Sequence, residues 1–199
     1  MPDTTPLHRS TELLSVADSG LLVVDVQEKL IGLVPEHRRI VWNIGRLLDG
    51  AKVLGVFAAA TEQYPQGLGP TTPVLAQRFE STPDNPVPAK TMFSCRGCAS
   101  TFDGFRRRGL FKLLVVGIET HVCIQQTVLD AMANGFRVYV AVDAVGARFA
   151  VDHETALRRM ESCGATLTTT ESALFEWCEV AGTPQFKEIS RIVRQAMPE

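Results

Sequence analysis

Short apolar runs recur along the chain and predict the strands of a sheet. Most positions inside these runs are apolar, with little alternation, which is typical of strands buried on both faces of a parallel sheet. The four clear runs span residues 21–26, 52–59, 112–118 and 136–142, and a weaker fifth spans residues 165–169.

The segments between the runs place apolar residues at helical spacing. We expect the first of these helices to stop at Gly50, because glycine is common just past a helix end. Strands that alternate with helices indicate βαβ units, and hence an α/β fold whose mostly parallel sheet is covered on both faces. The predicted helices span residues 35–50, 101–109, 121–134, 152–163 and 186–195.

Residues 64–88 form the least regular stretch and contain six prolines. Such a stretch is either a linker between two domains or a long surface excursion of one domain. We favour the excursion, because neither flank holds enough strands to form a sheet alone. The expected organisation is therefore a single domain over residues 1–199, in which residues 1–12 form a flexible N-terminal segment.

Composition narrows the function classes. Hydrophobic residues make up 45% and charged residues 21%, and the formal net charge is −2, so a long disordered chain is not expected. That balance gives no electrostatic reason to expect nucleic acid or an anionic membrane as partner. The cysteine count is five, which is odd and excludes a complete disulfide framework. With no secretory leader and no membrane-spanning run, the cysteines predict a reducing, cytoplasmic location.

Three chemistry-bearing residues follow predicted strands or loops that lead to one edge of the sheet, where α/β proteins bind ligands. Asp25 lies inside the first apolar run, near its end, where a carboxylate is costly unless it is paired or functional; a helix cap or a solvated loop acid is the alternative. Cys123 falls in the first turn of a predicted helix, which favours a thiolate nucleophile. A small buried apolar residue is the alternative for Cys123. Lys90 is either a surface lysine or a partner of these two.

Three motifs carry a resemblance that spans roughly residues 13–195. They are Leu-Val-Val-Asp-Val-Gln at 22–27, Ala-Lys-Thr-Met-Phe-Ser at 89–94 and Gly-Ile-Glu-Thr-His-Val-Cys at 117–123. The chain thereby resembles the isochorismatase-like cysteine hydrolases, and within them the isochorismatase-domain-containing proteins.

The resemblance implies a fold and a set of site residues. The fold is a Rossmann-like three-layer α/β/α sandwich, and family members commonly form homo-oligomers. A cis peptide bond is implied between Ile118 and Glu119, and the backbone N–H groups of Glu119 and Cys123 are the implied oxyanion hole. The implied catalytic triad is Asp25, Lys90 and Cys123.

The chain departs from the nicotinamidases of this superfamily, which bind a metal through an Asp-x-His motif. The corresponding residues 60–65 read Ala-Thr-Glu-Gln-Tyr-Pro, and no histidine lies between His37 and His121. We therefore expect no metal and no cofactor, and nicotinamide is a poor substrate candidate. Residues near this stretch are either substrate-binding or plain loop positions; the candidates are Glu62, Gln63, Tyr64 and Phe93.

Three functions remain in competition. The leading hypothesis is a cysteine hydrolase that cleaves a small amide or related C–N bond through a thioester on Cys123. The second is a non-catalytic binding or scaffold protein that retains the triad. The third is a thiol redox protein that uses Cys95 and Cys98, which form a lone Cys-x-x-Cys pair.

Overall fold

A six-stranded parallel sheet forms the centre of the molecule, seen here in a computed structural model that describes residues 7–79 and 87–197. The spatial order is β3-β2-β1-β4-β5-β6, so β1 and β4 lie in the middle. The strands are β1 (Ser19–Val24), β2 (Ala58–Gln63), β3 (Ala89–Lys90), β4 (Lys112–Ile118), β5 (Arg137–Gly146) and β6 (Thr166–Thr168).

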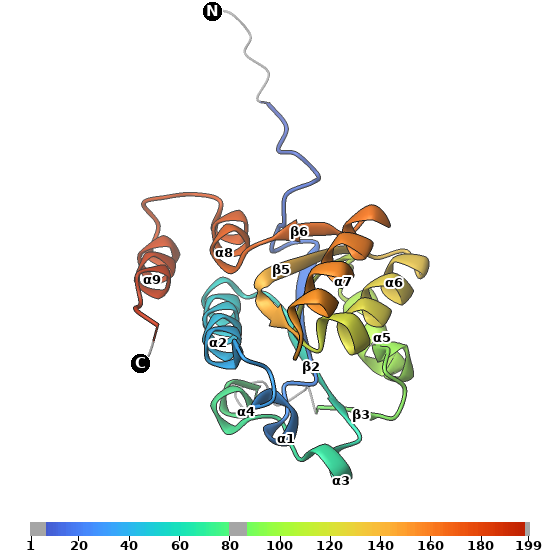
Figure 1. The fold of residues 1–199 in the computed structure, drawn as a ribbon. Helices are drawn as coiled ribbons and strands as arrows, with labels where there is room; N and C mark the ends of the chain where they lie inside the picture. Colours follow the sequence, from blue (N-terminus) through green and yellow to red (C-terminus); the bar gives the residue numbers. More distant parts are fainter. Residues whose placement is uncertain (1–6, 80–86, 198–199) are drawn as a thin grey trace, which may run out of the picture.

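Helices cover both faces of the sheet (Figure 1). One face carries α2 (His37–Leu54), α4 (Pro73–Phe79), α8 (Thr170–Cys178) and α9 (Pro184–Val193). The other carries α5 (Ala99–Arg107), α6 (Gln125–Ala133) and α7 (Ala150–Ser162). The short helices α1 (Glu28–Ile31) and α3 (Pro65–Leu68) follow β1 and β2. The expected Rossmann-like three-layer α/β/α sandwich is confirmed.

The lack of alternation in the apolar runs has a direct structural cause in β4. Leu114 and Val116 pack into the core beneath α2, whereas Leu113 and Val115 pack into the core beneath α5 and α6. Successive side chains point to opposite faces of a strand, and both faces are covered. Every residue of β4 is consequently buried.

The prediction of a strand over residues 52–59 and of a helix end at Gly50 is wrong. Helix α2 continues to Leu54 and ends where Gly55 adopts a left-handed conformation with φ 76°. Position 50 thus lies inside the helix, and it is a glycine because a side chain there would overlap Leu174 of α8. This glycine permits close helix packing, and β2 begins only at Ala58.

Glycine is also required at position 117, near the end of β4. Gly117 has φ 122° and lies opposite Val24 in the β1–β4 pairing, where a Cβ atom would overlap the Val24 backbone. The close approach brings the carboxyl ends of the two central strands together, directly before Asp25 on one strand and Glu119 on the other. Across the described residues, no helix combines the length and apolarity needed to cross a membrane.

Candidate active site

An ion pair between Asp25 and Lys90 lies at the carboxyl edge of the sheet. Asp25 directly follows β1 with φ 54°, and its N–H donates to the Thr61 carbonyl of β2 at 3.1 Å. Lys90 ends the edge strand β3, and its Nζ donates to Asp25 Oδ2 at 2.6 Å. Both side chains are 0% exposed. Two of the three predicted catalytic residues are therefore in direct contact.

The ammonium group of Lys90 is surrounded by oxygen atoms. Besides Asp25, it donates to Gln63 Oε1 at 2.7 Å and to the carbonyls of Phe93 and Met92 at 2.8 and 3.2 Å. Burial, the largest single effect, lowers the pKa of Lys90, but the charge and hydrogen bond of Asp25 together with smaller contributions from Cys95 and Cys123 outweigh it, and the net pKa is raised. Lys90 thus stays charged and supplies a fixed positive charge.

Cys123 lies in the π-helical turn Thr120–Ile124, between β4 and α6, and only 4% of it is exposed. Its thiol lies close enough to the Asp25 carboxylate for each group to shift the pKa of the other, so all three predicted catalytic residues come together. The prediction of a thiolate at this position is wrong. Burial, and next the negative charge of Asp25, raise the pKa of Cys123 above its ordinary value, so the thiol keeps its proton.

The carboxylate of Asp25 is the matching proton acceptor. Burial raises its pKa above the ordinary value, although Lys90, Cys123 and Thr61 all favour the charged form through hydrogen bonds or charge. A raised pKa makes a carboxylate a stronger base. The arrangement places a neutral thiol beside a buried base that is itself held by an ammonium group.

The predicted substrate-binding residues separate into distinct positions. Gln63 is buried, and its amide bridges Lys90 Nζ and the Thr91 carbonyl, so it supports the ion pair. Glu62 accepts from the N–H and hydroxyl of Thr71, which anchors the following loop. Tyr64, 53% exposed, lines a cavity of about 330 Å³ beside Lys90.

Phe93, the fourth predicted pocket residue, contributes its carbonyl to Lys90, while half of its side chain is exposed. Met92 before it is similarly exposed and also lines the cavity beside Lys90, together with Tyr64, Pro65, Gln66, Ala89, Thr91 and Gly97. The lining therefore mixes apolar and polar side chains, and Phe93 is not part of it.

The residues of the expected oxyanion hole begin directly after β4. The peptide bond between Ile118 and Glu119 is cis. The Glu119 side chain is 7% exposed and accepts from Arg148 twice, at 3.1 Å from the backbone N–H and 3.0 Å from Nε. Arg148, from the loop after β5, thus fixes the Glu119 side chain at the start of the turn that holds Cys123.

Two residues that sequence reasoning gave no role support the site. Thr61 Oγ1 donates to Asp25 Oδ1 at 2.9 Å, and the Gln27 amide bonds with the backbone N–H and carbonyl of Gln63. Thr61 was missed because the misplaced strand over residues 52–59 ended before it. A polar residue at the carboxyl end of the correct strand would have signalled it.

The Cys-x-x-Cys pair is buried, and both of its thiols are free. Burial raises the pKa of Cys95 to about 12, and burial also raises the pKa of Cys98. Reactive redox cysteines are accessible and have lowered pKa values. The surroundings of these two thiols therefore argue against the thiol redox alternative.

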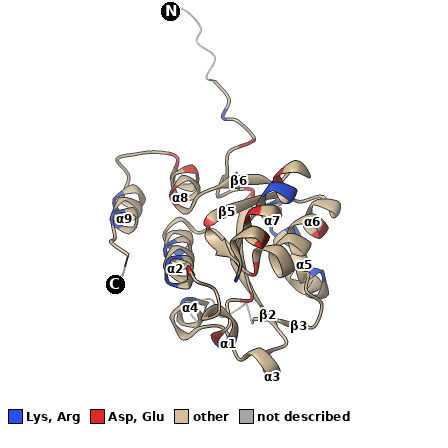
Figure 2. Ribbon diagram, viewed as in Figure 1, with Lys and Arg blue, Asp and Glu red and all other residues tan. Residues whose placement is uncertain are grey.

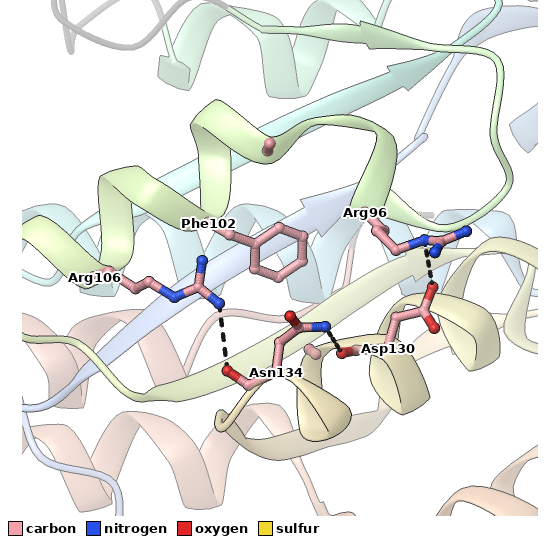
Figure 3. A pocket seen from close by; sticks show the side chains of 7 residues that line it. Arg96, Phe102, Arg106, Asp130 and Asn134 are labelled. Atoms are coloured by element: carbon pink, nitrogen blue, oxygen red, sulfur yellow. Dashed lines mark hydrogen bonds and ion pairs between the residues drawn. The ribbon is translucent and has the colours of Figure 1, made fainter.

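A second, smaller hollow of about 100 Å³ lies between α5 and α6 (Figure 3). Its charged side chains already have partners: Arg96 lies 3.5 Å from the Asp130 carboxylate, and Arg106 donates to the Asn134 backbone carbonyl at 3.3 Å. None of the predicted site residues lines it. Within residues 7–79 and 87–197, no group of three or more His, Cys, Asp or Glu side chains is arranged to hold a metal ion.

Known proteins of the same fold share much of this sequence. The chain is 41% identical to isochorismatase domain-containing protein 2A of Mus musculus over 183 residues, which cover 91% of this chain and 85% of that protein. Among solved structures, MAR1 ribonuclease from Caenorhabditis elegans is 34% identical with a TM-score of 0.86, and the match covers 94% of this chain and 95% of that one.

A further solved structure is YcaC from Escherichia coli, described as an octameric hydrolase of unknown specificity. It is 27% identical with a TM-score of 0.78, and the match covers 87% of this chain and 85% of that one. The isochorismatase domain itself matches residues 19–172, which include Asp25, Lys90 and Cys123. This match supports a hydrolase of the superfamily, and the chain belongs to the isochorismatase domain family.

Proposed function

We propose that the protein is a cysteine hydrolase that cleaves a small amide or related C–N bond through a thioester on Cys123. The observation that carries the proposal is the buried Asp25 carboxylate, which pairs with the Lys90 ammonium at 2.6 Å and lies close enough to the Cys123 thiol to shift its pKa. A thiol that keeps its proton needs a base at the moment of attack, and Asp25 is that base.

The reaction begins when Asp25 takes the thiol proton and Cys123 Sγ attacks the carbonyl carbon of the substrate. The negative charge that develops on the carbonyl oxygen is stabilised by the backbone N–H groups of Glu119 and Cys123. Asp25 then returns the proton to the departing amine as the C–N bond breaks. Water hydrolyses the thioester, with Asp25 again as the base.

Lys90 acts by charge. Its ammonium group has four oxygen neighbours within 3.2 Å and a raised pKa, so it is poorly suited to give up a proton. Its field limits how far the pKa of Asp25 rises and stabilises the anionic groups formed during attack. We also propose that the substrate is a small neutral molecule, because Asp25 and Lys90 neutralise each other. No cofactor is required for these steps.

The test is a panel of small amides and carbamoyl compounds, with ammonia or amine release as the readout. Cys123→Ser and Asp25→Asn are expected to lower turnover at least ~100-fold, since proton transfer alone contributes about that factor. Cys163→Ser is the matched control, because this thiol is exposed and lies just after the C-terminal end of α7. Wild-type turnover in either site variant contradicts the proposal.

The same panel separates other functions. An RNA oligonucleotide belongs in it, because one of the similar structures carries the name ribonuclease. RNA cleavage that survives Cys123→Ser would overturn the assignment, and an inert Cys123 would favour a binding or scaffold protein.

We further propose a single-domain homo-oligomer in the cytoplasm. Light scattering on protein eluting from a size-exclusion column should then give a molar mass of at least two chains of 21.8 kDa, and a mass of one chain would contradict the oligomer.

A further inference from the structure

Thr61 makes two contacts with Asp25 from the neighbouring strand. Its carbonyl accepts the Asp25 N–H at 3.1 Å, and its hydroxyl donates to Asp25 Oδ1 at 2.9 Å. Lys90 occupies the other carboxylate oxygen, Oδ2. Both oxygens of the base are therefore bonded, one to a charged donor and one to a neutral donor. Thr61 is itself 1% exposed, so water does not compete for its hydroxyl.

The direction of the hydrogen bonds behind Thr61 follows from donor counting. A hydroxyl has one proton, and a carboxylate can only accept, so the Thr61 proton goes to Asp25. Cys95 Sγ lies 3.3 Å from the same hydroxyl oxygen and must then be the donor. The Cys95 backbone is fixed in turn, because its N–H donates to Thr127 Oγ1 at 2.9 Å.

This direction agrees with the chemistry of the Cys95 side chain. A donor thiol must keep its proton, and burial raises the pKa of Cys95 to about 12. The chain of bonds therefore runs from the Cys95 thiol through the Thr61 hydroxyl to Asp25 Oδ1. A hydroxyl bond to a carboxylate favours its charged form and fixes its orientation.

We propose that Thr61, oriented by the buried Cys95 thiol, is a positioning residue that keeps Asp25 ionised and aimed at the proton of Cys123. This inference rests on the proposed function, since it assigns a partner to the base of that reaction. It also gives the first cysteine of the Cys-x-x-Cys pair a role that needs no redox chemistry. Cys98, whose sulfur lies 3.9 Å from the Ala89 carbonyl, has no part in this chain of bonds.

The experiment measures the rate at which acrylamide alkylates Cys123 as a function of pH, by mass spectrometry of the Cys123 peptide. In the wild type, the rate falls on the acid side as Asp25 takes up its proton. Thr61→Val keeps the shape and removes the hydroxyl bond, so the pKa of Asp25 rises and the acid limb moves to higher pH. We expect a shift of about one pH unit, which is roughly tenfold in rate on that limb.

The controls separate positioning from packing. Thr61→Ser restores the hydroxyl and should return the limb to its wild-type position, whereas Thr101→Val, at a buried threonine of α5, should not move it. Cys95→Ala should shift the limb in the same direction by less, and Cys98→Ala should leave it in place. If Thr61→Val does not fold, Thr61→Ala carries the same test.

The outcomes distinguish this inference from the proposed function. If Asp25→Asn abolishes neutral-pH alkylation but Thr61→Val keeps the wild-type limb, Thr61 has no positioning role and the hydrolase proposal stands. If Thr61→Ser is impaired as much as Thr61→Val, the hydroxyl is not the cause and the inference is overturned. If Asp25→Asn reacts like the wild type, the proposed function fails and this inference fails with it.

Discussion

At the scale of single residues, the buried thiol of Cys95 makes the stability of the folded protein depend on pH. Burial raises its pKa from the ordinary 9.0 to about 12 in the folded protein, whereas the unfolded chain titrates near the ordinary value. The folded state therefore keeps the proton on this thiol up to a higher pH than the unfolded chain does. The stability that it contributes is complete below pH 9.0 and is lost as the pH rises toward 12.

A urea titration at several alkaline pH values measures this loss. The free energy of unfolding should fall by up to about 1.4 kcal/mol per pH unit for each such thiol, and Cys123 shifts in the same direction. In Cys95→Ala the decline should be shallower by about one such contribution. An equal slope in the variant and the wild type would show that Cys95 titrates normally.

At the scale of the elements, the contact between β1 and β4 depends on Gly117. In Gly117→Ala the new Cβ has to displace the Val24 backbone, in addition to the cost of a left-handed conformation. The expected loss in the free energy of unfolding is about 1–2 kcal/mol from the backbone and another ~1–3 kcal/mol from overpacking.

Gly135→Ala is the matched control for this substitution. Gly135 also has a positive φ, 84°, but a Cβ there meets nothing within 4 Å. It should cost only the backbone part, about 1–2 kcal/mol. Equal urea midpoints for the two variants would contradict the view that β1 and β4 approach each other unusually closely at Gly117.

The elements also show what a sequence can and cannot predict. Strand β4 matches its predicted bounds, 112–118, because burial on both faces leaves an uninterrupted apolar run. The end of α2 was misjudged, because the reason for Gly50 lies in α8, more than a hundred residues away. Strand β3 has two residues, too few for any periodicity.

The same contrast holds for the candidate site. Asp25 and Cys123 can be identified from the sequence itself, because each lies near or beyond the end of a clear apolar run, where α/β proteins bind ligands. Lys90 follows an irregular stretch and was identified by resemblance alone. The proton state of Cys123 could not be predicted from its helix-start position, since it depends on burial and on Asp25, which arrives from another strand.

At the scale of the whole molecule, surface charge and site charge are separate. The chain has 20 basic and 22 acidic residues, and Figure 2 shows both signs interspersed over the helices. Many of these residues pair locally at the surface, as Arg191 does with Glu188 at 2.8 Å. The pair that matters for the proposed reaction is instead fully buried, at the carboxyl edge of the sheet.

This burial of Asp25 and Lys90 isolates the reacting groups from dissolved ions. Mobile ions screen charges at the surface, over about 10 Å at 0.1 M and 3 Å at 1 M salt, but screen buried pairs far less. The rate at which a neutral reagent such as acrylamide modifies Cys123 should therefore stay within about twofold between low and molar sodium chloride. A steep salt dependence would mean that the pair is open to solvent. The proposed base, Asp25, would then act on the thiol with nearly the same strength at very different salt concentrations.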